Sequence, residues 1–277
     1  QGVLIYFTNA GAGGNWASTR LFVPPAHGNG NPYSFGAWHG HDIMADSNGN
    51  IHVLYYFEDP SPGGEGMFYL YRDSATNTWT THSHTTNANR IIDGVAPRGI
   101  KMVLSSDGDI HVLFWVDYSS PWMGSLQYGK ITNPATASAS LTTVTLDTAD
   151  ASNKYEIKYR PGYWARDTEW GFDVDNLNRP HITYQVQKPY QHLEYAFLNS
   201  NDVFEYDSPD AAEHQPQMNP IPHPENGTNG YLTRAAGVHS SLAIDSNGNL
   251  NILYNSTVET GRFQMLTTAT KPGYAPP

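Results

Sequence analysis

The chain has 277 residues, no cysteine and a formal net charge of −11 at pH 7. Its length suffices for one large all-β domain or two ordinary domains with a sizeable core. The lack of cysteine excludes a disulfide framework and a thiolate metal site. The acidic balance argues against nucleic acid or an anionic membrane as the main partner, and no apolar run reaches the length of a membrane span.

The composition is typical of a turn-rich β protein. Charged residues make up 15% of the chain and aromatic residues 13%, with 25 glycines and 19 prolines. Such a chain forms strands from aromatic and β-branched residues and turns from glycine, proline and asparagine. A strand-like run begins almost at Gln1, with no signal peptide before it, so we expect an exported protein, secreted or at the cell surface, that has lost its signal.

The first predicted elements are two strands within residues 1–24. They match the third and fourth strands of a later four-stranded unit, with Trp16 aligned to Trp79. Next comes a segment that recurs four times without gaps, at residues 43–56, 102–115, 172–185 and 242–255. Each copy reads as strand, tight two-residue turn and strand. Glycine or asparagine in the turn suits positive φ, and the turn positions are Gly49, Gly108, Asn178 and Gly248.

A third strand follows each hairpin, and a fourth strand follows most of these. The third strands are expected at residues 68–71, 126–129, 193–196 and 263–266. The fourth strands are expected at residues 78–83, 141–146 and 203–207. Four-stranded antiparallel units repeated along a chain predict a β-propeller, whose blades pack face to face.

The predicted fold is therefore all-β, a single propeller domain over residues 1–277 with about five blade positions and incomplete terminal blades. The partial first blade covers residues 1–24, and the later blades cover about 37–85, 96–147, 163–208 and 234–270. The strand count leaves open a four-bladed ring with one surplus strand. It also leaves open a larger ring whose terminal blades are completed by other domains or chains.

The last repeat, "GVHSSLAIDSNGNLNILYNS" followed by "RFQMLTTA", resembles a bacterial secreted β-propeller repeat. That repeat reads Ser-Leu-Ala-x-Asp-x-x-Gly, then x-x-His-Ile-x-Tyr, then Leu-x-Tyr-Ala, and the resemblance extends over four repeats. It implies a propeller of the kind found in surface adhesins, lectin-like modules and polysaccharide-degrading enzymes. More distantly, the chain is similar to propeller-type polysaccharide lyases.

Three histidines occupy the same place in the second strand of their repeats. His52, His111 and His181 align with one another, and Asn251 replaces them in the last repeat. Because the position recurs, we expect a scaffold role in which these side chains satisfy backbone or turn groups inside each blade. The turn "DSNGN" loosely resembles a calcium loop, but its glycine and the missing glutamate do not fit the EF-hand pattern. We therefore expect no metal and no cofactor, with calcium at these turns as the alternative.

The residues just before the first strand of each blade differ in chemistry from blade to blade, as a ligand site requires. The segments are 37–42, 96–101, 163–170 and 234–240, at the predicted central funnel. The alternative interpretation is that they form only the polar edge of a solvent-filled channel. The candidate residues are Trp38, His39, His41, Arg98, Lys101, Tyr163, Trp164, Arg166, Asp167, Trp170, Arg234 and His239.

Two functions fit these residues. Aromatic faces stack on sugars and cations bind hydroxyls or carboxylates, which predicts a carbohydrate-binding or adhesion module with a poly- or oligosaccharide partner. The alternative is a polysaccharide lyase acting on uronic acids, with His39 or His239 as base, Arg98 or Arg166 facing the carboxylate, and Tyr163 as acid. A hydrolase would use paired carboxylates, for which Asp42, Asp167 and Glu169 are available at no diagnostic spacing.

Overall fold

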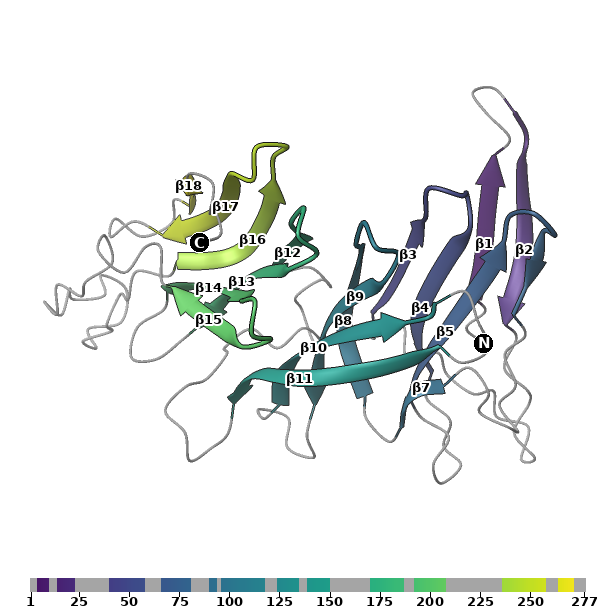
Figure 1. The fold of residues 1–277 in the computed structure, drawn as a ribbon, viewed down its shortest axis with the longest axis horizontal. Coiled ribbons are helices and arrows are strands. Elements are labelled where there is room, and N and C mark those ends of the chain that lie inside the picture. The colour runs from purple at the N-terminus through teal and green to yellow at the C-terminus, as the bar shows by residue number, and fades with distance from the viewer. Residues whose placement is uncertain are drawn as a thin grey trace, which may run out of the picture.

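The structure is a computed structural model, in which every regular element within the described ranges is a β-strand (Figure 1). The described residues are 4–9, 14–22, 40–57, 66–80, 90–93, 96–117, 124–134, 139–149, 170–186, 192–207, 236–257 and 264–271. Within these ranges no helix of membrane-spanning length and hydropathy occurs. The strands form five antiparallel sheets, which follow one another in sequence order.

The first sheet contains two strands, β1 (Leu4–Asn9) and β2 (Trp16–Phe22). It stacks on the second sheet, since the Tyr6 ring meets the Trp79 ring edge to face at a centroid distance of 5.2 Å. Leu21 packs against the buried cluster of that sheet. The N-terminal strands therefore form a partial blade, as the sequence predicts.

The second sheet carries an extra strand. Its elements are β3 (His41–Ala45), β4 (Ile51–Phe57), β5 (Gly66–Asp73), β6 (Thr78–Trp79) and β7 (Arg90–Asp93). Both β6 and β7 pair with β5, one toward each end of that strand. The single fourth strand expected at 78–83 is thus replaced by two short strands in the described residues, and positions 81–83 lie outside those residues.

The third and fourth sheets are complete four-stranded meanders, and the fifth sheet has three strands. The third sheet consists of β8 (Ala96–Leu104), β9 (Ile110–Asp117), β10 (Gly124–Thr132) and β11 (Ser140–Ala149). The fourth consists of β12 (Gly171–Val174), β13 (Pro180–Val186), β14 (His192–Leu198) and β15 (Phe204–Asp207). The fifth consists of β16 (Ala236–Ile244), β17 (Leu250–Thr257) and β18 (Gln264–Lys271).

The core lies between successive sheets. Strand β9 contributes to the core on both sides of its sheet, because neighbouring side chains of a strand point to opposite faces. Val112 and Phe114 pack toward the second sheet, whereas Leu113 and Trp115 pack toward the fourth. A strand buried on both faces needs a continuous apolar run, and this is why the sequence of β9 shows no polar alternation.

The hairpin turns show a longer loop than the sequence analysis expected. The amide of Asp46 donates to the carbonyl of Asn50, and the amide of Gly49 donates to the carbonyl of Asp46, both at 3.0 Å. Residues 47–49 therefore form a three-residue loop, in which a turn is followed by a left-handed residue. The predicted positive φ is confirmed, with 78° at Gly49, 89° at Gly108 and 62° at Asn178.

These sheets are the successive blades of a β-propeller, which confirms the predicted fold class. The strands of the described residues fill five blade positions, with two strands in the first sheet and three in the last. The first and last sheets lie at opposite ends of the molecule, so the described sheets form an open arc (Figure 1). The turns β3–β4, β8–β9, β12–β13 and β16–β17 all lie along the concave edge of this arc.

Candidate functional site

Only part of the predicted site falls within the described residues. The side chains of His41, Lys101 and Trp170 are described, whereas Arg98 and His239 are described by their backbone alone. The remaining candidates lie outside the described residues, and they are Trp38, His39, Tyr163, Trp164, Arg166, Asp167 and Arg234.

The sequence analysis places His41, Arg98, Lys101 and His239 before the first strand of their blades, and this placement is wrong. His41 is the first residue of β3, Arg98 and Lys101 lie inside β8, and His239 lies inside β16. Pairing with the second strand continues through an irregularity between Arg98 and Lys101, where Gly99 has a φ of 56°. A bulge of this kind lets a strand extend across a residue that breaks the regular ladder.

Asp42 joins the inner strands of two sheets. Its Oδ2 accepts a hydrogen bond from the Met102 amide of β8 at 2.7 Å, and its Oδ1 accepts one from the Ile43 amide at 2.8 Å. Burial raises the pKa of this carboxyl, although these bonds and the charge of Lys101 act in the opposite direction. His41, the preceding residue, is exposed.

Lys101 extends the same connection to the fourth sheet. Its ammonium donates to the backbone carbonyl of Trp170. Burial lowers the pKa of Lys101, and the Asp42 carboxylate opposes this effect. Three successive blades thus contribute neighbouring groups, from the start of β3, the middle of β8 and the residue before β12, and the structure brings Lys101 and Trp170 of the predicted set into direct contact.

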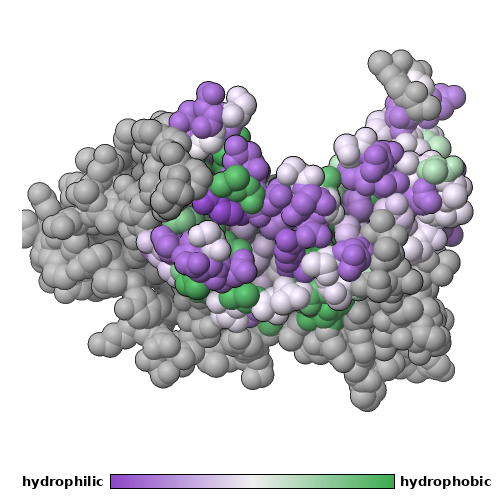
Figure 2. Space-filling view, in the orientation of Figure 1, coloured by the Kyte–Doolittle hydropathy of each residue, from purple (hydrophilic) through white to green (hydrophobic). Residues whose placement is uncertain are grey.

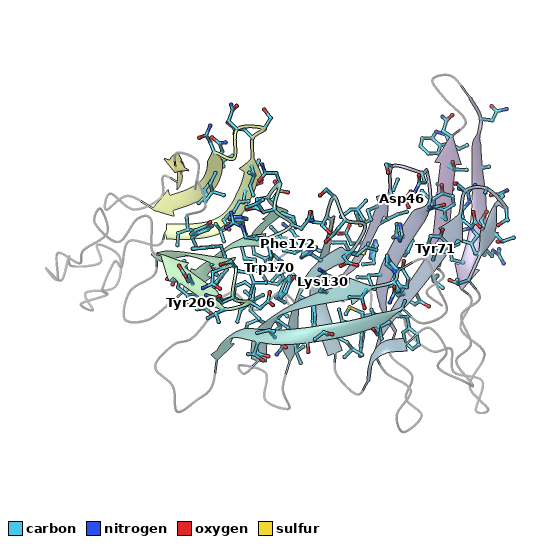
Figure 3. All side chains as sticks on the ribbon, in the orientation of Figure 1. Asp46, Tyr71, Lys130, Trp170, Phe172 and Tyr206 are labelled. Atoms are coloured by element: carbon cyan, nitrogen blue, oxygen red, sulfur yellow. The ribbon has the colours of Figure 1, made fainter. Side chains whose placement is uncertain are left out.

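The Trp170 side chain lies in the hydrophobic core. It is 3% exposed and packs with Phe172 between the third and fourth sheets (Figure 3). Its indole Nε1 is buried and has no hydrogen-bond partner among the described residues. Packing against the core accounts for this ring without a ligand.

The inner strands approach one another closely. A Cβ placed on Gly40 would lie 2.5 Å from the backbone nitrogen of Ile100. A Cβ on Gly171 would lie 2.8 Å from the backbone nitrogen of Leu242. Glycine at these two positions lets adjacent blades touch along their inner edge, and this contact brings the polar groups of neighbouring strands together.

The repeated histidines are internal anchors, as the sequence analysis expects. Their Nδ1 atoms bond to tyrosine hydroxyls of the third strand in the same blade, and they are buried in each case. The pairs are His52–Tyr69 at 2.7 Å, His111–Tyr128 at 2.7 Å and His181–Tyr195 at 2.6 Å. Nε2 of His52 and of His181 also faces the turn aspartate of its own blade, at 3.5 Å from Asp46 and 3.2 Å from Asp175, so a turn group stands beside the tyrosine partner.

In the fifth sheet this polar pair is replaced. Asn251 takes the histidine position, is exposed, and donates to the carbonyl of Asn249 at 3.2 Å. The tyrosine position in β18 holds Thr268, since Leu253 opposite it corresponds to Leu54 of β4. Both members of the pair therefore change together in the fifth sheet, and Thr268 lies beyond the third strand that the sequence predicts at residues 263–266.

The turn aspartates serve the hairpins. Oδ1 of Asp46 accepts bonds from the amides of Asn48 and Asn50, both at 2.9 Å, and Oδ2 accepts one from the Asn50 amide side chain at 2.7 Å. Burial opposes ionisation of Asp46, but these bonds outweigh it and hold its pKa below the ordinary value. Among the described residues no group of three or more histidine or acidic side chains is arranged to hold a metal ion.

A polar cavity that the sequence analysis missed lies at the concave edge, at the other end of the inner strands. Its volume is about 650 Å³, and three successive hairpin turns line it. Hydrophilic residues gather along this edge (Figure 2), where Asp46 is labelled in Figure 3. The polar turns were visible in the sequence, but their convergence depends on how the blades stack.

Comparison with known proteins gives no family. No family model matches the sequence, and no curated protein does. Among solved structures, an endo-arabinase from Bacteroides thetaiotaomicron VPI-5482 is 12% identical with a TM-score of 0.45, over 95% of this chain and 83% of that chain. Arabinanase Arb43A from Bacillus subtilis is 11% identical with a TM-score of 0.40, over 86% and 74% of the two chains. Polysaccharide lyase Uly1 is 13% identical with a TM-score of 0.45, over 94% and 63%.

Proposed function

We propose that the chain is a carbohydrate-binding module of an exported protein, which holds an oligosaccharide between the start of β3 and the middle of β8. The observation that carries this proposal is the interaction of the Asp42 carboxylate of β3 with the charge of Lys101 of β8, beside the exposed His41. An imidazole, a carboxylate and an ammonium come from two successive blades. A scaffold position would repeat one chemistry in each blade, whereas a ligand site draws on different groups.

These three groups match the chemistry of a saccharide. Hydroxyl groups donate to a carboxylate and accept from an ammonium, and bonds to charged groups are stronger than neutral ones. The Lys101 ammonium has three N–H donors, of which one is directed to the Trp170 carbonyl. The remaining donors can reach a sugar hydroxyl or the carboxylate of a uronic acid.

A second candidate function is a polysaccharide lyase. Exposed His41 lies next to Asp42, whose carboxyl is close to a lysine ammonium, and this combination of a base with a cation favours elimination chemistry. In such a reaction the base removes the proton next to the uronic carboxylate, the carbon–oxygen bond breaks, and an acid protonates the leaving oxygen. His39, His239, Tyr163, Arg98 and Arg166 remain predicted members of that site.

The test of binding is a glycan array probed with the labelled protein, with neutral and uronate-containing glycans on the same surface. Binding is expected, and His41→Ala and Lys101→Met should each weaken it by about tenfold, the effect of one lost charged hydrogen bond. Lys130→Met is the matched control, because Lys130 pairs with Asp109 at 2.8 Å on another part of the third sheet.

Two results would contradict the proposal. The first is the absence of any glycan ligand across the array. The second is binding that both site variants retain at the level of the Lys130→Met control. The lyase alternative is tested separately by incubating the protein with uronate polysaccharides and following the absorbance of unsaturated sugars, and no increase over any of them would exclude it.

A further inference from the structure

The cavity at the concave edge is built from three blades. Its lining comes from the turns β3–β4, β8–β9 and β12–β13 and from the two residues that follow β10. Its volume of about 650 Å³ lies within the range of small-molecule sites. At the volume of liquid water this space would hold about 20 water molecules. A ligand larger than a single ion therefore fits.

The charge of the lining excludes an anionic ligand. Asp46 and Asp175 are the charged residues that line the cavity, and no lysine or arginine does so among the described residues. The carboxyl of Asp175 is buried, which opposes ionisation, but bonds from His181 and Arg179 hold its pKa well below the ordinary value. Both carboxylates are therefore ionised near neutral pH and repel phosphates, sulfates and uronates.

The same carboxylates are poorly placed to bind a metal ion. Oδ1 of Asp175 accepts bonds from the amides of Leu177 and Arg179, both at 2.9 Å. Its Oδ2 is held by the Arg179 guanidinium at 2.6 Å and lies 3.2 Å from His181 Nε2. Asp46 is bonded to its own turn in the same way. A cation would have to displace these donors.

A buried histidine, His52, contributes to the wall of the cavity. The Tyr69 hydroxyl donates to the Pro134 carbonyl at 2.6 Å, so its oxygen must accept the Nδ1 proton of His52. Burial lowers the pKa of His52, which leaves Nε2 of the neutral ring as an acceptor. This Nε2 is buried, has no hydrogen-bond partner among the described residues, and lies 3.5 Å from Oδ2 of Asp46.

His52 Nε2 has no donor among the described residues, whereas Asp46 Oδ2 accepts one bond, from the Asn50 side-chain amide at 2.7 Å. A carboxylate oxygen can accept a further bond, and a hydroxyl group in the cavity can donate to Asp46, whose side chain is 15% exposed. Neutral donors and acceptors complete the lining, since the side chains of Ser47, Asn48 and Asn176 form no hydrogen bonds with other described residues. These groups match a ligand that carries several hydroxyls and no charge.

We propose that this cavity is a second ligand site, which binds a neutral, hydroxyl-rich molecule such as an uncharged sugar unit. It is separate from the site proposed at the start of β3 and the middle of β8. His41 and Asp46 stand at opposite ends of β3, and five residues of extended strand span about 16 Å. The two sites also differ in charge, because the cavity lacks a cation comparable to Lys101 among its described lining residues.

The test follows backbone amides of the ¹⁵N-labelled protein by NMR while saccharides are added. The probes are neutral pentose and hexose oligosaccharides, a uronic acid oligosaccharide and calcium chloride. We expect the neutral oligosaccharides to shift amides in the turns at residues 46–50, 105–109 and 175–179. Ser47→Ala and Asn176→Ala should each weaken this binding by about three- to tenfold, the effect of one lost neutral hydrogen bond.

The fifth sheet supplies a matched control. Its turn, Asp245–Asn249, repeats the sequence Asp-Ser-Asn-Gly-Asn and the same aspartate hydrogen bonds, but it does not line the cavity. Ser246→Ala should therefore leave the binding unchanged. An equal loss in Ser246→Ala and Ser47→Ala would show that the turn fold, and not the cavity, was affected, and would overturn the proposal.

Three other outcomes would also overturn it. These are the absence of shifts with every neutral oligosaccharide, shifts produced by calcium alone, and shifts produced equally by the uronic acid oligosaccharide. Failure here is distinguishable from failure of the proposed function. Saccharide shifts confined to the start of β3 and to β8 near Lys101 would support the proposed function while excluding the cavity.

Discussion

Removal of the Tyr128 hydroxyl is expected to destabilise the protein substantially. His111 is 1% exposed and Tyr128 is 5% exposed, and their Nδ1 and Oη atoms are 2.7 Å apart. The Nε2 of His111 has no hydrogen-bond partner among the described residues. In Tyr128→Phe the buried imidazole would lose its remaining bond. Leaving such a group unsatisfied costs about 2 kcal/mol.

Urea denaturation measures this cost. With an m value of about 3 kcal/mol/M, a loss of about 2 kcal/mol lowers the midpoint by roughly 0.7 M. Tyr206→Phe is the matched control, because the exposed Tyr206 hydroxyl donates to the Leu146 carbonyl at 3.1 Å, and a loss below about 0.5 kcal/mol is expected there. In a double-mutant cycle with His111→Leu, the Tyr128→Phe effect should largely disappear.

A urea midpoint of Tyr128→Phe equal to that of Tyr206→Phe would refute a stabilising hydrogen bond between His111 and Tyr128. It would also be refuted by additive effects of Tyr128→Phe and His111→Leu, because residues that act through one shared bond do not add.

Three further predictions concern the contacts between blades, the turns and the pH dependence. Gly171→Ala should lower the free energy of unfolding by about 3 kcal/mol, since its Cβ would lie 2.8 Å from a backbone nitrogen of β16. Gly108→Ala, where nothing lies within 4 Å of the Cβ but φ is 89°, should cost about 1 kcal/mol. Burial lowers the pKa of His111 to about 4 from an unfolded value of about 6.5, so the unfolded state binds this proton first as the pH falls. Stability should therefore decrease by about 3 kcal/mol between pH 6.5 and 4, and His111→Gln should reduce that decrease.

Thermal or urea unfolding checks all three. An equal cost for Gly171→Ala and Gly108→Ala would contradict the close approach of β12 and β16. Unchanged pH dependence in His111→Gln, measured between pH 6.5 and 4, would contradict the buried neutral imidazole. The turn aspartates, whose pKa values are lowered, lose their contribution below their unfolded value of about 3.8, which separates the two effects.

The blade repeat was predictable because its signals are local. The alternation of strand formers with Asn-Gly turns sets the register of each hairpin, and the recurrence of His52, His111 and His181 gave the alignment between blades. The division of the fourth strand of the second sheet into β6 and β7 was not predictable. Pairing of β7 with β5 joins residues that are far apart in the sequence, and no local sequence pattern indicates it.

The candidate site was predictable only in part. Residue types that vary between blades pointed to His41 and Lys101, which the structure places on neighbouring inner strands. Proline and glycine around Arg98 and Gly99 predict a connection between strands. In the structure this segment is part of β8, because it pairs with β9 across a bulge. The cavity at the turns was missed because it depends on the stacking of three blades, which a single repeat cannot reveal.

The stacking of the sheets makes the molecule a linear array of interfaces. Each blade shares a hydrophobic cluster with the next one along the chain, and polar links such as Asp42 to Met102 and Asp173 to Ile244 join the inner strands. In such an array the stability is approximately the sum of blade and nearest-neighbour contributions. Mechanical load applied at the chain ends would then be carried by the interfaces in series, so the weakest interface sets the force that the whole domain withstands.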